Sequence, residues 1–296
     1  MNASHQPVLL RETLEYLAPK PGQTIVDGTL GLGGHAREIA ARLGAQGKLV
    51  GVERDERTLK ETAKCLHGPN ITLVLGNFAD LPGILKGIKI PAVDGIFLDL
   101  GISSCQLADP AYGLSWQVEA PLDMRLTGEG NTALEVIRHL NEKDLTDALY
   151  RLADERHSRP IARALKEHYR ELKTTTDLER VIEQAVGRRG RLHPATKTFL
   201  ALRILVNREL PNLEEFLRAA AQCLAPGGRL VIISFHSGED RLVKQAFKDK
   251  NIWQALTKKP IMASRDEERQ NPRSRSAKLR AATLINSKLE VRNSKQ

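Results

Sequence analysis

Cysteine is scarce in this sequence, and its placement excludes two kinds of stabilising framework. The chain has three cysteines among 296 residues, Cys65, Cys105 and Cys223, and none of them forms a CxxC pair. A disulfide scaffold and a cysteine-based zinc site are therefore not expected. Eight histidines occur, but none has an HxxxH or HExxH spacing, so the sequence predicts no metal site.

Long apolar runs are also missing, and no leader sequence is expected. No stretch approaches the roughly 20 apolar residues of a membrane span. The N-terminal MNASHQPVLLRETLEYL lacks the basic start and plain apolar core of a signal peptide. We therefore expect a cytoplasmic protein that has no membrane partner. Aromatic residues make up 4% of the chain, which is too few for RNA recognition through many stacked bases.

Positive charge, in contrast, is present in excess. The formal net charge is +9, and basic residues gather in GRRGRLHPATK (187–197) and NPRSRSAKLR (271–280). An excess of this sign favours a polyanionic partner, above all nucleic acid. The best candidates for phosphate contacts are Arg188, Arg189, Arg191 and Lys197, although a solvated charged loop is the alternative reading.

The first third of the chain alternates between two kinds of segment. Buried strands are expected over 23–29, 48–55, 71–78 and 92–101, and helices over 35–44 and 56–66. Repeated β-α-β units of this length predict a parallel sheet that is covered on both faces. The expected fold class is therefore α/β, with a Rossmann-like sheet.

A long helical stretch interrupts this pattern. No convincing strand occurs over 107–210, and Thr176 with Glu179 fits a capping box for one of its helices. Strand character returns at 226–235, and 254–261 and 276–285 supply two further possible strands. We therefore expect a sheet domain made of residues 1–107 and 211–296, with an all-helical insertion at 108–210.

The stretch DGTLGLGGHA (27–36) raises the question of a ligand. Closely spaced glycines between a strand and a helix let backbone N–H groups approach a nucleotide, and Glu53, at the end of the second strand, suits ribose hydroxyls. NAD and S-adenosylmethionine both fit. Asp27 favours S-adenosylmethionine, since a carboxylate there would repel a pyrophosphate. The absence of a P-loop lysine disfavours ATP. By fold-level analogy, the late strands resemble the ending of class I methyltransferases.

Six blocks of sequence together carry a more specific resemblance. They run in one order along nearly the whole chain: VDGTLGLGGHA, FLDLGISSCQL, APLDMRL, HPATKTFLALRILVN, PGGRLVIISFHSGEDRLVK and NPRSRSAKLR. The chain thereby resembles the bacterial methyltransferases that modify the N4 amino group of a cytidine in 16S ribosomal RNA. The resemblance implies S-adenosylmethionine as methyl donor and 16S rRNA, within the small ribosomal subunit, as substrate. It does not settle whether the protein is a monomer or a homodimer.

The resemblance also implies which residues bind the donor. The matching positions lie in the glycine loop and after the second, third and fourth strands: Gly33, Gly34, His35, Glu53, Phe78, Asp99 and Gln106. Glu53 stands where the family typically has an acid, often aspartate, and Phe78 would pack on the adenine. Ala36 and Gly238 depart from the family pattern, which commonly has Ser and Leu there.

The chemistry requires a poor nucleophile to be aligned with the sulfonium methyl group, because the N4 lone pair is delocalised into the ring. Orientation contributes much of the rate, and an acceptor near N4 can take its proton. Asp99, in DLGIS, is the first candidate for this acceptor, and a role toward the donor alone is the alternative. Ser103, Ser104 and His236 are further candidates, since ligands of such sheets bind at the carboxyl ends of the strands.

Three other functions remain open from the residues alone. An NAD-dependent oxidoreductase would use the same glycine loop but would give Asp27 no role. A non-catalytic RNA-binding protein of ribosome assembly would have a vestigial donor site. A methyltransferase of proteins or small molecules would not need the basic segments at 187–197 and 271–280.

Overall fold

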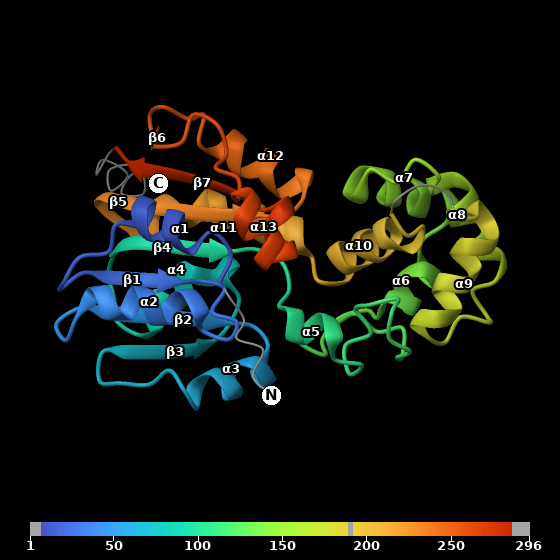
Figure 1. Ribbon diagram of the computed structural model, residues 1–296, viewed down its shortest axis with the longest axis horizontal. Helices are drawn as coiled ribbons and strands as arrows, with labels where there is room; N and C mark the ends of the chain where they lie inside the picture. The colour runs from blue at the N-terminus through green and yellow to red at the C-terminus, as the bar shows by residue number, and fades with distance from the viewer. Residues whose placement is uncertain (1–6, 189–191, 286–296) are drawn as a thin grey trace, which may run out of the picture. The chain divides into compact units, whose positions relative to one another are not determined.

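The computed structural model describes residues 7–188 and 192–285 (Figure 1). The chain forms two compact units, unit 1 from Met1–Gly101 with Pro211–Gln296, and unit 2 from Ile102–Leu210. Residues 102–107, which the sequence analysis placed in the sheet domain, thus belong to unit 2. The reason is that the buried side chain of Ile102 packs into the helical core of unit 2.

Unit 1 is built on a seven-stranded sheet in the order β3-β2-β1-β4-β5-β7-β6. Neighbouring strands are parallel except that β7 runs antiparallel to both β5 and β6. This arrangement confirms the predicted α/β, Rossmann-like class. The strands are β1 Thr24–Asp27, β2 Lys48–Glu53, β3 Ile71–Leu75, β4 Val93–Asp99, β5 Leu224–Ser234, β6 Trp253–Ala255 and β7 Lys278–Leu284.

Strand β6 is shorter than the sequence suggested. The expected segment 254–261 pairs with β7 over Trp253–Ala255 only, and Ile261 returns to Leu279 as an isolated bridge. A connection containing Lys258, Lys259 and Pro260 separates the two contacts. Proline has no N–H to donate to a ladder, so a continuous strand there is disfavoured.

Alternate residues of the central strands point to opposite faces of the sheet, and each face has its own core. Ile25 and Phe97 belong to one core, while their neighbours Val26 and Ile96 belong to the other. Because both faces of the sheet are buried, the central strands must be apolar at nearly every position, as β4 is. The helical segments of unit 1 are α1 Leu10–Leu17, α2 Gly34–Leu43, α3 Glu56–Ala63, η1 Phe78–Asp80, α4 Leu81–Gly87, α11 Glu209–Cys223, α12 Ser237–Ala246, α13 Arg265–Gln270 and η2 Pro272–Ser276, with α11 beginning just before the unit does.

The described part of unit 2 contains helices and no strand, with one isolated bridge between Pro121 and Thr174 and a non-helical segment over 109–132. Its core gathers apolar side chains of every helix except α5, with Phe199 and Leu202 of α10 among them. The helices are α5 Ser104–Ala108, α6 Ala133–His139, α7 Glu142–Ala153, α8 Ser158–Glu167, α9 Thr175–Val186 and α10 Ala195–Val206.

The capping box of α9 lies two residues earlier than predicted. Thr174, not Thr176, accepts the Asp177 N–H with its side chain, and Asp177 in turn accepts the Thr174 N–H. The neighbouring Thr175 does not cap the helix, because its hydroxyl donates to the Val118 carbonyl at 2.6 Å. Among the described residues, no helix has both the length and the apolar composition to cross a membrane.

Candidate functional site

Three acidic residues end neighbouring strands of the sheet in unit 1. Asp27 ends β1, Glu53 ends β2 and Asp99 ends β4. Because these strands are parallel and adjacent, their carboxyl ends meet at one edge, where ligands of such sheets bind. The sequence analysis named all three residues, and the structure brings them to the same edge.

Asp27 is almost completely buried, with an exposed fraction of 1%. One carboxylate oxygen, Oδ1, accepts the Thr29 N–H at 3.1 Å. Burial raises the pKa of Asp27 to about 7 against the effect of this hydrogen bond, and the charges of Asp99 and Glu53 raise it further. Such a carboxyl is close to half protonated at neutral pH and becomes a strong acceptor when a cation approaches.

A stability prediction follows from the raised pKa of Asp27. The folded protein retains this proton between pH 3.8, the ordinary pKa of an aspartate, and the raised pKa of about 7, so the carboxyl lowers stability as the pH rises through that window. Asp27→Asn should therefore raise the free energy of unfolding by about 2 kcal/mol at about pH 8 and by much less at about pH 5. Urea unfolding at both pH values checks this, and an equal gain at both would contradict it.

Glu53 holds the glycine loop in place through hydrogen bonds to backbone N–H groups. Its Oε2 accepts the Gly31 N–H at 2.9 Å and its Oε1 accepts the Asp55 N–H at 3.0 Å. Burial raises the pKa of Glu53, and these two hydrogen bonds oppose the shift. The Thr62 hydroxyl holds the same loop by donating to the Gly31 carbonyl at 2.6 Å.

The glycines of the loop are required by close approach and by backbone conformation. Gly33 has φ 74°, in the left-handed region, and it is the N-cap residue of α2. A Cβ at Gly34 would lie 2.8 Å from Cγ of Pro7, and one at Gly28 would lie 2.4 Å from Cδ2 of Leu98. No side chain within residues 7–188 and 192–285 caps the start of α2. Its first N–H groups therefore suit an anionic ligand group.

Asp99 lies beside His35, which comes from the start of α2. His35 Nε2 lies 2.9 Å from the Val8 carbonyl, so in the neutral ring Nε2 carries the proton and Nδ1 offers a lone pair. That Nδ1 is 3.7 Å from Asp99 Oδ2. The other oxygen of Asp99, Oδ1, is buried without a hydrogen-bond partner among the described residues. An unpaired oxygen of this kind is open to a ligand donor.

Burial also sets the protonation of Asp99. It raises the pKa of Asp99 to about 7, the positive charge of Arg273 opposes the shift, and the negative charge of Glu239 adds to it. A pKa near neutral pH is well matched to a group that must take up a proton during reaction. The site thus contains a carboxyl suited to general base work.

Thr29 joins the ends of β1 and β4, and the sequence analysis missed it. Its N–H donates to Asp27, while its hydroxyl oxygen accepts the Asp99 N–H at 2.6 Å. A threonine two residues after an acidic strand end is a common turn pattern. The sequence DGT therefore indicates a turn, but it does not specifically predict that Thr29 joins β1 and β4.

Phe78 begins η1, directly after β3, and is partly buried. Its ring meets Phe216 edge to face, with centroids 5.7 Å apart, and it packs against the core of one sheet face. Its Cβ lies 3.2 Å from the position that a Cβ on Gly28 would take. Phe78 is thus both a core aromatic and a neighbour of the glycine loop.

His236 has a structural partner in α12. Its Nδ1 accepts the Glu239 N–H at 3.4 Å, and the His236 backbone N–H donates to Glu239 Oε2 at 3.3 Å. His236 Nε2 lies 3.2 Å from Glu239 Oε1. The histidine therefore caps the start of α12.

Ser104 and Gln106 lie in unit 2, on α5. Gln106 forms a capping box with Ser103: the Ser103 N–H donates to Gln106 Oε1 at 3.0 Å, and the Gln106 N–H donates to Ser103 Oγ at 3.1 Å. Ser104 is exposed at the first position of the helix. The remaining candidates for donor binding lie in unit 1.

The candidate RNA contacts also belong to unit 2. Arg188 is exposed and forms ion pairs with Glu183 and Glu179 of α9. Lys197 Nζ donates to the Asp154 carbonyl at 2.7 Å. Arg189 and Arg191 lie outside the described residues.

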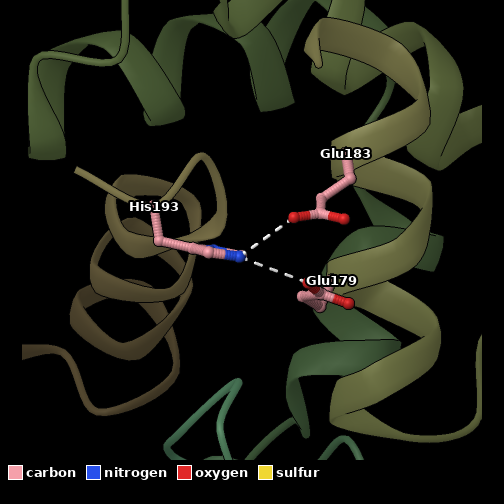
Figure 2. Close-up of side chains that lie close together, drawn as sticks. All are labelled: Glu179, Glu183 and His193. Carbon is pink, nitrogen blue, oxygen red and sulfur yellow. Dashed lines mark ion pairs between the residues drawn. The ribbon is translucent and has the colours of Figure 1, made fainter. Parts of the chain in front are cut away.

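The same two glutamates face a histidine (Figure 2). His193 Nε2 is 3.0 Å from Glu183 Oε1 and 3.3 Å from Glu179 Oε1, and its ring stacks on Trp116 with centroids 3.7 Å apart. These residue types could hold a metal ion. However, the Ala195 N–H donates to His193 Nδ1 at 3.3 Å, which places the proton of the neutral ring on Nε2. A protonated nitrogen is no ligand, so the geometry favours a charge contact between the ring and the two carboxylates, although Nε2 makes no hydrogen bond among the described residues.

Comparison with known proteins gives a match along nearly the whole chain. The model of the MraW methylase family matches residues 2–285. A protein of Sorangium cellulosum (strain So ce56), named Ribosomal RNA small subunit methyltransferase H, is 48% identical over 288 residues, covering 95% of this chain and 91% of its own. Proteins of the same name from Koribacter versatilis and Thermotoga neapolitana are 46% and 44% identical, covering 94% and 95% of this chain and 93% and 96% of their own.

Proposed function

Because the chain belongs to the MraW methylase family, we propose that it transfers the methyl group of S-adenosylmethionine to the N4 amino group of a cytidine in 16S ribosomal RNA. The observation that carries this function is the match to relatives named for methylation of small-subunit ribosomal RNA, at 44 to 48% identity and along the whole fold. The protein is an S-adenosylmethionine-dependent methyltransferase, and its sheet has the class I arrangement.

The acidic edge of unit 1 fits the methyl donor. The buried carboxyl of Asp27 suits the donor's amino group, Glu53 suits the ribose hydroxyls, and the uncapped start of α2 suits the carboxylate. Phe78 offers a ring face for the adenine. The full set proposed for donor binding is Asp27, Gly33, Gly34, His35, Glu53, Phe78, Asp99 and Gln106.

Asp99 is the residue proposed to accept the proton. As N4 bonds to the methyl carbon, the bond from that carbon to sulfur breaks and its electron pair stays on sulfur. The nitrogen then carries a positive charge, and Asp99 takes its proton. Asp99 suits the task because one of its buried oxygens has no hydrogen-bond partner in the described part of the chain and because burial raises its pKa to about 7. Ser104 and His236 are further candidates for a contact to the base, and His236 also caps α12.

Unit 2 is the part proposed to recognise RNA, through Arg188, Arg189, Arg191 and Lys197. Arg188 already pairs with glutamates in the free protein, but exposed ion pairs are worth little, so exchange for a phosphate is inexpensive. The assembled small subunit is the proposed form of the substrate, and the cytoplasm is the proposed location because ribosomes are found there. A monomer and a homodimer are both compatible with this function.

Replacing Arg188, Arg189 and Arg191 together by alanine should weaken RNA binding. Each phosphate contact on a single strand contributes roughly 0.7 to the slope of log affinity against log salt, so the slope should flatten by about 2 if all three arginines bind phosphates. Filter binding of unmodified 16S rRNA over a salt series measures this. An unchanged slope would remove these arginines from the RNA surface.

A binding experiment separates the proposal from its nearest rival. Calorimetry of the purified protein with S-adenosylmethionine and with NADH should show binding of the first alone. Binding of NADH would favour the oxidoreductase that the glycine loop also permits. Donor binding without methyl transfer to any RNA would instead favour a non-catalytic assembly protein.

A further inference from the structure

Helix α8 carries a row of basic side chains along one face. Arg159, Arg163 and Lys166 occupy positions i, i+4 and i+7 of the helix. Arg170 follows in the turn beyond the helix, where its Cζ and Lys166 Nζ lie 5.6 and 5.7 Å from the centre of the Tyr169 ring. Side chains at these intervals lie on the same side of a helix. The buried face of the helix is made of other residues, namely Ser158, Ile161, Ala162 and Leu165. We call Arg159, Arg163, Lys166 and Arg170 the α8 ridge.

Two members of the α8 ridge are held in place by neighbouring groups. Lys166 Nζ donates to the Ile137, Arg138 and Leu140 carbonyls at 2.9, 3.0 and 2.7 Å, at the end of α6. Arg170 Nε donates to the Tyr169 hydroxyl at 3.1 Å, and its Cζ lies 5.6 Å from the centre of that ring. Contacts of this kind reduce the side-chain entropy that is lost when a ligand binds.

Among the described residues, a single ion pair with a carboxylate involves the α8 ridge. Arg163 has an ion pair with Glu142 at 3.7 Å, but both side chains are about half exposed or more, at 69% and 49%. Such a pair contributes little. The pKa of the Tyr169 hydroxyl is lowered by the Arg170 hydrogen bond and then by the charges of Arg170, Arg138 and Lys166. The local potential at this surface is therefore positive.

We propose that the α8 ridge binds the sugar–phosphate backbone of the RNA substrate, as a second contact beside the segment at 187–197. From Arg159 to Lys166 the row extends about 10 Å at the helical rise of 1.5 Å per residue. Guanidinium groups in such a row bind phosphates bidentately, and no base sequence is read. This assignment rests on the proposed function, since it takes the substrate to be RNA.

The test compares two variants that each lose two positive charges. Arg159→Gln with Arg170→Gln removes both ends of the α8 ridge. Lys60→Gln with Lys64→Gln is the matched control, because these lysines of α3 in unit 1 are similarly exposed, at 70% and 67%. The ridge variant should bind unmodified 16S rRNA about tenfold more weakly at about 0.1 M salt, with a salt slope lower by about 1.4. Its KM for RNA should rise while kcat and donor affinity stay unchanged.

Each outcome decides the proposal. Equal losses in both variants would show a general charge effect and overturn the ridge, as would unchanged RNA binding by the ridge variant. If the ridge variant binds naked RNA normally and loses affinity only for assembled subunits, the ridge binds a ribosomal protein and the proposal is overturned. If the unsubstituted protein transfers no methyl group to RNA, the proposed function fails, while the comparison of RNA binding between the two variants still decides the ridge.

The Tyr169 contact provides an independent check on the ridge. Tyr169→Phe keeps the ring beneath Arg170 but loses the hydroxyl, whereas Tyr169→Leu loses both. If the ring positions Arg170 for a phosphate, the affinity for RNA should fall in the order Tyr, Phe, Leu at equal donor affinity. Equal affinities of all three proteins would leave Tyr169 without a positioning role.

Discussion

Asp99→Asn is expected to reduce kcat for methyl transfer by about 10² to 10³-fold, within the range that general acid–base groups contribute. The asparagine keeps the shape of the side chain and its place at the end of β4, but its amide cannot take the proton from N4. The Asp99 N–H to Thr29 contact is a backbone contact and survives the change. Donor affinity should therefore change far less than kcat.

The pH dependence of the unsubstituted enzyme is a second test of whether Asp99 accepts the proton. A carboxylate that takes a proton must be ionised, so kcat/KM for RNA should be full above about pH 7 and should fall about tenfold per unit below it. The asparagine variant should lack this step. Burial is the main cause of the raised Asp99 pKa. The positive charge of Arg273 lowers this pKa, and the negative charge of Glu239 raises it further.

Asp94→Asn is the matched control for Asp99→Asn. Asp94 lies on the same strand near its opposite end, where its Oδ2 accepts the Thr24 N–H at 2.8 Å. An asparagine oxygen can accept that bond as well. Activity close to that of the parent protein is expected, measured as labelled methyl incorporated into RNA. If Asp99→Asn loses donor binding in proportion to its activity, Asp99 is a donor contact and not the base.

Glu53→Gln should weaken binding of S-adenosylmethionine by about tenfold to a hundredfold, the range for losing a hydrogen bond to a charged group. Glu53 accepts two backbone N–H groups, from Gly31 and Asp55, with its two oxygens. A glutamine has one oxygen, so its NH₂ group must face one of these donors. The glycine loop would lose a support and the ribose would lose an acceptor.

Calorimetry of donor binding measures the Glu53 effect directly. Glu56→Gln is the control, since Glu56 is exposed at the start of α3 and pairs with Lys60. The control should bind the donor as the parent protein does. Unchanged donor affinity in a folded Glu53→Gln protein would contradict the role of Glu53. Glu53→Asp should bind more tightly than Glu53→Gln, because it restores two acceptor oxygens.

The acidic edge could be predicted because it follows from strand periodicity alone. Asp27, Glu53 and Asp99 each come at the end of an apolar run, and parallel strands bring such ends together. Their pKa values could not be predicted, because burial depends on packing between elements. Likewise, nothing in SFHSGED shows that His236, rather than Ser237, caps α12.

The α8 ridge escaped the sequence analysis for a physical reason. Basic clusters such as 187–197 are contiguous and visible in the sequence, whereas the ridge residues are separated by apolar positions that face the core. Their grouping appears only when α8 is known to begin at Ser158 and to bury Ile161 and Leu165. Helix boundaries, which are the least certain part of a sequence reading, therefore decide whether such a surface is found.

Analysis of the methylated nucleoside tests the central claim most directly. The purified protein would be incubated with labelled S-adenosylmethionine and small ribosomal subunits from a strain that lacks the enzyme. The rRNA would then be digested to nucleosides for mass spectrometry. The account predicts N4-methylcytidine with the parent protein and its loss in Asp99→Asn protein that still binds the donor. Label on another nucleoside or on protein, or no label despite donor binding, would contradict it.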